Sequence, residues 1–219
     1  MKLSLAVLCA TLMHCAQAKE SAPKSTAASP RQSLLQPESA NEAAPATFRA
    51  RFVTTKGDIV IEANRQWSPI GVDRFYNLVK RGYYDNVAFF RPLKGFIVQL
   101  GVSGSSVVNS KWRTAFIKDD PVMQTAKRGT VTFAHAGANT RNTQFFINMA
   151  DNAALDKQNF VTFGEVVQGM DVVEKLHMDY GDGPPAGKGP NQFRLLDEGN
   201  VYLEREFPLI DYVRMATVE

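Results

Sequence analysis

A single arginine inside an apolar stretch near the middle of the chain constrains the fold more than any other residue. The stretch reads FFRPLKGFIVQLG and runs from Phe89 to Gly101. Desolvating a charge without a partner is costly, so Arg91 must be paired or must have a function. On a β-strand, Ile97 and Gln99 share one face because successive side chains alternate. From these residues alone, Gln99 either satisfies a hydrogen bond in the core or belongs to a site.

A second segment carries a similar mixture of polar and aromatic residues. It reads FAHAGANTRNTQFFIN and runs from Phe133 to Asn148. On a strand, Gln144 and Phe146 share a face, so a polar and an aromatic side chain lie next to each other. The two segments together are the candidate functional region of the chain.

The N-terminus has the pattern of a secretory signal peptide. Lys2 is followed by an apolar run from Leu3 to Met13 and by the sequence Ala16-Gln17-Ala18. That run is shorter than the roughly 20 residues that span a bilayer. We expect residues 1–18 to be a signal peptide cleaved after Ala18, and the mature protein to be periplasmic or secreted. The alternative is a cytosolic protein with an apolar N-terminus.

Both cysteines of the chain, Cys9 and Cys15, lie in this signal segment. The mature chain would therefore have no disulfide, no thiol nucleophile and no cysteine-ligated metal site. A lipid anchor at Cys15 is a minor alternative, because the bulky His14 before the cysteine fits a lipoprotein signal poorly.

Charge and motifs exclude several classes of function. The chain has 25 Lys and Arg against 22 Asp and Glu, a balance that argues against a nucleic-acid-binding protein. Beyond the signal segment the histidines are His135 and His177, which form no metal-ligand pattern. The sequence near Gly187-Lys188 lacks the spacing of a phosphate loop. We expect no cofactor and no metal.

The rest of the chain divides into a linker and one domain. Residues 19–46 are rich in Ala, Ser, Pro and Glu without an apolar period, which predicts a disordered linker. Residues 47–219 are predicted to fold as a single domain.

The predicted domain contains many short strands and few helices. A hairpin is expected over 48–63 with its turn at 56–58, followed by a helix from Pro69 to Gly82 with Ser68 as its N-cap. A second helix is expected from Met170 to about His177, and Gly181–Pro190 is expected to be a loop. Further strands are predicted at 96–100, 129–133, 144–149 and 161–166, with strand-like sequence from 199 to 219. This pattern is typical of a mainly β barrel or sandwich.

The segments from Phe89 and Phe133 resemble the signature sequences of the cyclophilin family of peptidyl-prolyl cis-trans isomerases. The resemblance extends from about Phe48 to Ile210 and looks closest to bacterial secreted members. It implies a closed eight-stranded antiparallel β-barrel capped by two α-helices. It also implies an enzyme that rotates the peptide bond before proline.

The resemblance assigns a role to ten residues. Arg91 corresponds to the catalytic arginine of the family, and Gln99 to the glutamine that holds it. The walls of the proline pocket correspond to Phe96, Ile97, Phe146 and Leu155. Positions along the adjoining groove correspond to Ala134, His135 and Gln144, and Phe160 stands near a position that is often histidine or tyrosine.

Several positions depart from the family pattern. Ala154 stands where many members have a large aromatic residue, so we expect a wider groove and weak binding of the cyclic peptide cyclosporin. Phe90 stands where histidine is usual, and Pro92 cannot donate a hydrogen bond within a sheet. His135 replaces a frequent asparagine and would bring a titrating group to the edge of the groove.

The first functional hypothesis is therefore a monomeric peptidyl-prolyl isomerase that assists the folding of exported proteins. Its partners would be unfolded polypeptides that contain proline, with no nucleic acid and no membrane span. The alternative is a non-catalytic chaperone or scaffold module that binds proline-containing segments. The pair of Arg91 and Gln99 favours the enzyme, since a pure binder has no need of a positioned charge.

Overall fold

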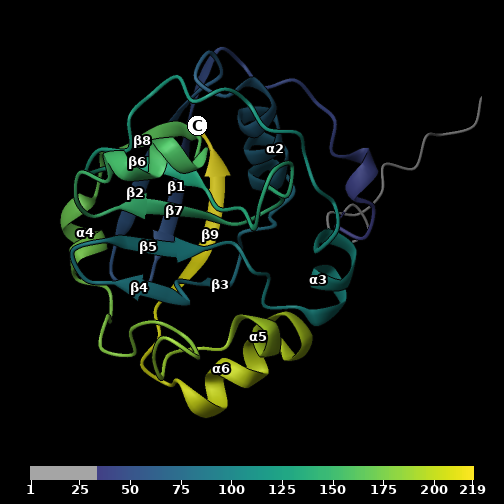
Figure 1. Ribbon diagram of the computed structural model, residues 1–219. Helices are drawn as coiled ribbons and strands as arrows, with labels where there is room; N and C mark the ends of the chain where they lie inside the picture. The colour runs from purple at the N-terminus through teal and green to yellow at the C-terminus, as the bar shows by residue number, and fades with distance from the viewer. Residues whose placement is uncertain (1–33) are drawn as a thin grey trace, which may run out of the picture.

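The computed structural model describes residues 34–219 (Figure 1). The predicted signal peptide at 1–18 and the first part of the predicted linker lie outside the described residues. Within the described part of the chain, no helix is both long enough and apolar enough to cross a membrane.

The predicted hairpin at the start of the domain is confirmed. Strand β1 (Thr47–Thr54) pairs with β2 (Asp58–Asn64) in antiparallel register. The turn closes where the N–H of Thr54 donates to the carbonyl of Gly57 over 3.0 Å. Gly57 adopts a φ of +134°, a conformation that side chains with a Cβ rarely adopt. The alternating apolar residues of β1, such as Phe52, are buried in the core.

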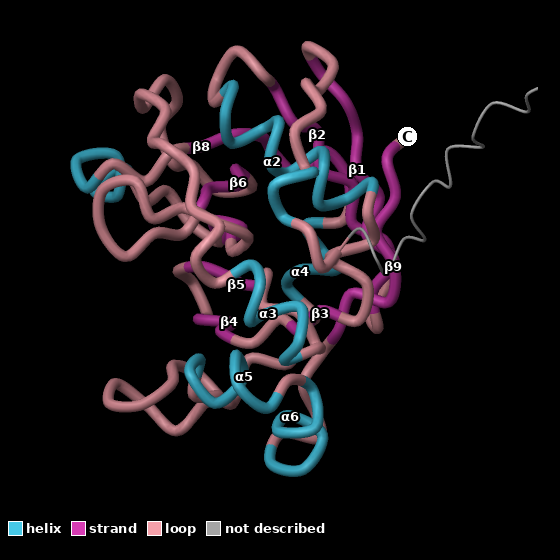
Figure 2. The backbone as a smooth tube through the Cα atoms, turned by 90° about the vertical axis from the view of Figure 1, so that its right-hand side faces the viewer, coloured by secondary structure: helices cyan, strands magenta, loops and turns pink. Residues whose placement is uncertain are grey.

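The remaining strands extend this hairpin into one antiparallel sheet. Its order is β3-β9-β1-β2-β8-β6-β7-β5-β4, and Figure 2 shows the sheet curling around the core. The additional strands are β3 (Val87–Ala88), β4 (Arg91–Leu93), β5 (Ile97–Leu100), β6 (Thr130–Phe133), β7 (Phe145–Asn148), β8 (Thr162–Gln168) and β9 (Tyr212–Val218). The strands predicted at 96–100, 129–133, 144–149 and 161–166 correspond to β5, β6, β7 and β8.

The chain itself joins the two ends of this sheet. Strands β3 and β4 lie at opposite ends of the strand order, yet Phe89 and Phe90 are the only residues between them in sequence. The mainly β, barrel-like fold is therefore confirmed. Nine strands appear in place of the eight expected because one continuous segment is interrupted at these two residues.

Helix α2 (Pro69–Lys80) packs its apolar face, which includes Val72 and Phe75, on the core of the barrel. Ser68 occupies the N-cap position and Pro69 begins the helix, as predicted, but the Ser68 side chain makes no capping hydrogen bond to the helix backbone. Asp120 accepts hydrogen bonds from the N–H groups of Ile70 (3.1 Å) and Gly71 (2.9 Å), and also from the Ser68 hydroxyl. A carboxylate from a distant loop thus satisfies the free N–H groups at the helix start.

The described residues contain more helices than the two expected. Short helices are present at α3 (Ser106–Trp112), α4 (Met170–Glu174), α5 (Gln192–Glu198) and α6 (Asn200–Glu206), and 3₁₀ turns at η1 (Pro37–Ser39) and η2 (Ala153–Gln158). Helix α4 corresponds to the second predicted helix but ends earlier. The segment from Gly199 was expected to be strand-like throughout, whereas α6 precedes β9. Helices of seven residues separated by Gly199 are too short to show a clear helical period.

The structure also differs from the predicted linker over residues 34–46. The indole N–H of Trp112 donates to the carbonyl of Leu34 (2.8 Å), and Asn77 donates to the carbonyl of Glu42 (2.8 Å). The N–H of Ala44 donates to Asp73 (2.8 Å), and Ala44 is buried. This segment is held by polar contacts of its backbone, which composition does not reveal.

A second, smaller core lies below the barrel, between the strand ends and helices α5 and α6 (Figure 1). We call it the lower core. Its buried members are Ala88, Phe90, Val102, Leu195, Tyr202, Leu203, Phe207 and Ile210, with Tyr180 packed against them. Because Phe90 directly precedes Arg91, the lower core fixes the backbone that carries the arginine.

Candidate active site

The candidate site is built on one row of residues that crosses four strands. Arg91 of β4 pairs with Gln99 of β5, Gln99 pairs with Phe146 of β7, and Phe146 pairs with Thr132 of β6. Residues directly opposite each other in an antiparallel sheet bring their side chains together on one face. The register therefore places the arginine, the glutamine and the phenylalanine next to one another.

A chain of hydrogen bonds runs from Arg91 into the sheet. Nη1 of Arg91 donates to Oε1 of Gln99 over 3.1 Å, and Nε2 of Gln99 donates to Oε1 of Gln144 over 3.0 Å. Gln99 is 7% exposed and Gln144 is 9% exposed. The amide group of Gln99 uses its oxygen toward the arginine and its nitrogen toward Gln144, so its orientation is fixed from both sides.

Asp182 holds the other edge of the arginine. Its carboxylate accepts Nε and Nη2 of Arg91, each over 2.7 Å, in a bidentate ion pair. The hydrogen bonds from Arg91 keep the pKa of the Asp182 carboxyl below its ordinary value, and the N–H of Gly183 adds to this effect. Sequence reasoning missed Asp182, because Gly181–Pro190 was interpreted only as a loop. The charge of Arg91, which required a partner, was the signal that such an acid should exist.

An aromatic group adjoins this polar chain. The rings of Phe146 and Phe160 meet edge to face with centroids 5.7 Å apart, and the ring of His135 stacks on Phe160 at 4.2 Å. Phe160 therefore lies between the ring of His135 and the ring of Phe146. Phe146 is 2% exposed, so its ring is held firmly by its neighbours.

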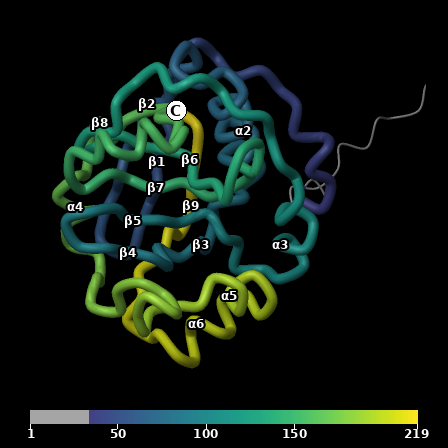
Figure 3. Tube along the Cα trace, viewed as in Figure 1, coloured from purple at the N-terminus to yellow at the C-terminus, as the bar shows by residue number. Residues whose placement is uncertain are grey.

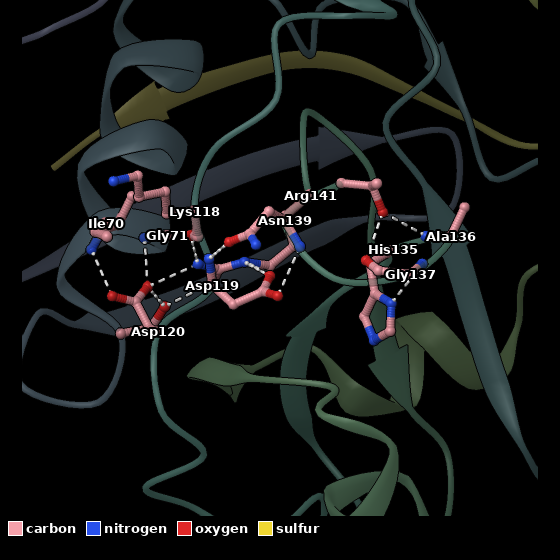
Figure 4. A network of polar contacts seen from close by, with 12 residues as sticks. Ile70, Gly71, Lys118, Asp119, Asp120, His135, Ala136, Gly137, Asn139 and Arg141 are labelled. Carbon is pink, nitrogen blue, oxygen red and sulfur yellow. Dashed lines mark hydrogen bonds and ion pairs between the residues drawn. The ribbon is translucent and has the colours of Figure 1, made fainter.

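His135 contacts its own loop (Figure 4) and the turn that precedes Phe160. Its Nδ1 accepts from the N–H of Gly137 over 3.1 Å, and its Nε2 lies 3.1 Å from the carbonyl of Gln158. Both contacts are satisfied together by a neutral imidazole with its proton on Nε2. The histidine thus connects the loop after β6 with the turn that precedes Phe160.

The groove residues meet at a pocket of about 340 Å³. Gln99, Ala134, His135 and Gln144 line one side of it. Gln192 and Leu196 of α5 contribute to the wall, so the helix that follows the glycine-rich loop forms part of the groove. A pocket of this size suits a side chain or a short peptide segment.

The other predicted pocket residues lie nearby without a direct side-chain bond to Arg91. Ile97 is buried beside Gln99 on β5, and Phe96 is 38% exposed just before it. Leu155 is half-buried on η2, and its carbonyl accepts the N–H of Phe160 over 3.3 Å. Ala154 is exposed beside it, so no aromatic ring occupies this position at the edge of the groove.

A buried ion pair fixes the loop that carries His135 (Figure 4). Arg141 is fully buried, and its Nη2 lies 3.1 Å from the carboxylate of Asp120 while its Nε lies 3.3 Å from that of Asp119. Asp120 is itself 7% exposed, so this carboxylate is part of the interior and not of a solvated loop edge. Asp120 thus ties the loop that carries His135 and Arg141 to the start of α2.

The departures at Phe90 and Pro92 have structural explanations. Phe90 is 1% exposed and packs in the lower core, where an apolar side chain is needed. Pro92 lies on β4, which has a hydrogen-bonded neighbour on one side only, so a residue without an N–H is tolerated there. Across the described residues, no group of three or more His, Cys, Asp or Glu could hold a metal ion.

The fold and this arrangement define a cyclophilin-like protein. Residues 49–191 match the profile of the family described as cyclophilin type peptidyl-prolyl cis-trans isomerase, and the chain belongs to that family. Peptidyl-prolyl cis-trans isomerase CYP18-2 of Arabidopsis thaliana is 36% identical over 129 residues, covering 56% of this chain and 76% of that protein. The isomerase cypE of Dictyostelium discoideum is 35% identical over 130 residues, covering 57% and 81%.

Solved structures agree on the fold. A cyclophilin type peptidyl-prolyl cis-trans isomerase of Cryptosporidium parvum aligns with a TM-score of 0.61 at 21% identity, covering 79% of this chain and 98% of that one. The same protein, crystallised in the presence of the dipeptide Ala-Pro, aligns with a TM-score of 0.59. The family match ends at residue 191, so α5, α6 and β9 lie beyond it.

Proposed function

We propose that this chain isomerises X-Pro bonds of exported polypeptides and that Arg91 is its central catalytic group. The observation that carries this proposal is the arginine held by Gln99 within one row that also contains Phe146. Of this row, Gln99 also lines the adjoining pocket, so a peptide in the pocket would lie next to the residue that holds the cation.

To catalyse this reaction, the enzyme mainly has to bind the twisted peptide bond more tightly than the planar one. Rotation about a peptide bond faces a barrier of about 18–20 kcal/mol, because amide resonance is lost when the bond twists. In the twisted state the proline nitrogen gains a lone pair. A guanidinium aimed at this nitrogen interacts more strongly with the twisted state than with the planar one, which lowers the barrier.

The residues around Arg91 have separate tasks in this proposal. Gln99 orients the guanidinium, and Gln144 in turn fixes the amide of Gln99. Phe146, with Phe96, Ile97 and Leu155 nearby, would hold the proline ring while the other side of the bond turns. Ala134, His135 and Phe160 would contact the peptide along the groove.

The role in export rests on the N-terminal sequence. The apolar run and the Ala16-Gln17-Ala18 site support cleavage after Ala18 and a periplasmic or secreted mature protein. Expression in a secreting bacterial host with N-terminal sequencing tests this proposal: a mature protein beginning at Lys19 supports it. A protein that keeps Met1, or that is lipidated at Cys15, contradicts it.

The activity is tested by the cis-to-trans rate of a short Ala-Pro peptide. The wild type should accelerate it, and Arg91→Ala should lower kcat/KM by about 100-fold, roughly 2.7 kcal/mol of barrier. Arg128→Ala removes an exposed arginine that pairs with Glu174 and is the matched control, expected to match the wild type. A wild type without acceleration would favour a module that only binds proline-containing segments. Equal rates in the wild type and Arg91→Ala would remove Arg91 from the mechanism.

A further inference from the structure

We propose that Asp182 is a positioning residue for Arg91: its carboxylate fixes the guanidinium in the orientation that the isomerisation requires. This inference rests on the proposed role of Arg91. The two residues are 91 positions apart in sequence, and the ion pair joins strand β4 to the loop between α4 and α5. Figure 3 shows this loop in yellow-green below β4.

The pattern of donors leaves part of the guanidinium available. An arginine side chain carries five N–H groups in a fixed plane. Asp182 accepts from Nε and Nη2, and Gln99 accepts from Nη1. Among the described residues these are the hydrogen bonds of the Arg91 side chain, so Nη1 and Nη2 each keep one N–H. Two acceptors thus fix the plane from two edges, and the remaining donors can face a substrate.

The loop is built closely around the backbone of Asp182. A Cβ at Gly187 would lie 2.3 Å from the carbonyl oxygen of Asp182, and one at Gly189 would lie 2.5 Å from that of Gly181. The N–H of Gly189 donates to the carbonyl of Asp182 over 2.8 Å. Glycine is therefore required at these positions for close approach rather than for flexibility. The result is a compact support that holds the carboxylate in place.

The lower core fixes both partners of the ion pair. Phe90, which precedes Arg91, is buried in it. Tyr180, two residues before Asp182, packs its ring against Phe207 at 5.0 Å, and its hydroxyl accepts the N–H of Leu209 over 3.1 Å. Because the same apolar cluster anchors both backbones, the distance between the arginine and the aspartate is set by packing and not by the ion pair alone.

Electrostatics alone would suggest the opposite effect, since a carboxylate reduces the positive potential around the guanidinium. We infer that orientation prevails, because Arg91 is 30% exposed on a short strand and a long side chain there samples several rotamers when unpaired. Misplacement of a catalytic group by about 1 Å can cost up to about 100-fold in rate. Asp182 should therefore raise kcat and leave substrate binding nearly unchanged.

The test compares full-length Asp182→Asn and Asp182→Glu with the matched control Asp179→Asn, an exposed aspartate of the same segment. Asp182→Asn should lower kcat about tenfold with KM within about twofold, and Asp182→Glu should restore part of the loss. The same Asp182→Asn change in an Arg91→Ala background should have no further effect. A rate at or above the wild type, or an equal loss in both backgrounds, would overturn the inference. Thermal unfolding identifies any variant that fails to fold, and Asp182→Glu then carries the test.

A second readout does not depend on activity. In a ¹⁵N-edited NMR spectrum, the Nε–H of Arg91 should be protected from exchange in the wild type and Asp179→Asn, and exposed in Asp182→Asn. If the wild type is active but this N–H is not protected, the ion pair is absent in solution. The inference about Asp182 then fails, while the proposed function stands. An inactive wild type that retains the protection would overturn the proposed function and support the pairing.

Discussion

Gln99 of β5 donates a hydrogen bond of 3.0 Å to Gln144, the residue before β7, although 45 positions separate them in sequence. The bond fixes the nitrogen of Gln99 and thereby turns its oxygen toward Arg91. Gln144 thus influences the orientation of Arg91 indirectly, through Gln99.

Replacing Gln99 by leucine should therefore lower kcat/KM by roughly tenfold or more, because Arg91 loses its acceptor in the sheet. Gln144→Leu should cause a smaller loss, since Gln99 keeps its own contact with the arginine. The Ala-Pro peptide assay measures both, with the exposed Gln168→Leu as the control. A larger loss of kcat/KM in Gln144→Leu than in Gln99→Leu would contradict the proposal that Gln144 acts through Gln99.

The activity should be nearly independent of pH from about pH 6 to about pH 8, because arginine does not titrate there. Asp182 also stays ionised, since the pKa of its carboxyl is lowered by Arg91. The measurement is the pH profile of kcat/KM. A clear step within this range would implicate an imidazole of the groove, and its loss in His135→Gln would identify the residue.

Stability should depend on Asp182 only above acidic pH. Its folded-state pKa is lowered, so its contribution is present above the unfolded value of about 3.9 and is lost as the pH falls through the folded value. The Tm of the wild type should exceed that of Asp182→Asn at about pH 6, and the difference should shrink below about pH 4. A constant difference over this range would mean that the ion pair does not stabilise the fold.

The lower core should depend strongly on Phe90. This side chain is 1% exposed, so Phe90→Ala should destabilise the protein by about 3–5 kcal/mol in urea unfolding. Phe193→Ala removes the same ring from a position that is 74% exposed and should change stability by less than about 0.5 kcal/mol. Similar values for both variants would contradict the packing described for α5 and α6.

Ala154 should control the binding of cyclosporin. Ala154→Trp would add an aromatic wall at the exposed edge of the groove, and we expect tighter binding by isothermal titration calorimetry. Ala153→Trp adds the same ring one position earlier on η2 and is the matched control. An unchanged affinity for Ala154→Trp would mean that position 154 does not border the peptide groove.

Local patterns and the family resemblance predicted much of the fold and part of the site. The hairpin of β1 and β2, helix α2 and strands β5 to β8 follow from alternation and helical period. Arg91, Gln99 and Phe146 followed from two signature segments. Those segments could be aligned residue by residue with the family signature sequences.

Contacts between distant segments were not predictable in this way. Asp182 meets Arg91 only because α5 and α6 fold under the barrel, and neither helix is long enough to show a clear period. Asp120 reaches the start of α2 from a loop some 50 residues away. At Phe90 the sequence showed only a departure from the usual histidine, and burial in the lower core explains it.

Two adjacent phenylalanines separate β3 from β4, and they point in different directions. Phe89 is buried in the barrel core and Phe90 in the lower core. A single peptide unit therefore belongs to two apolar clusters at once, directly before Arg91. Unfolding either cluster exposes a side chain on this unit, so amide hydrogens in the barrel and in α5 and α6 should exchange with similar opening free energies. The barrel core and the lower core would then unfold as one cooperative unit. Arg91 directly follows the residue pair that connects the two cores.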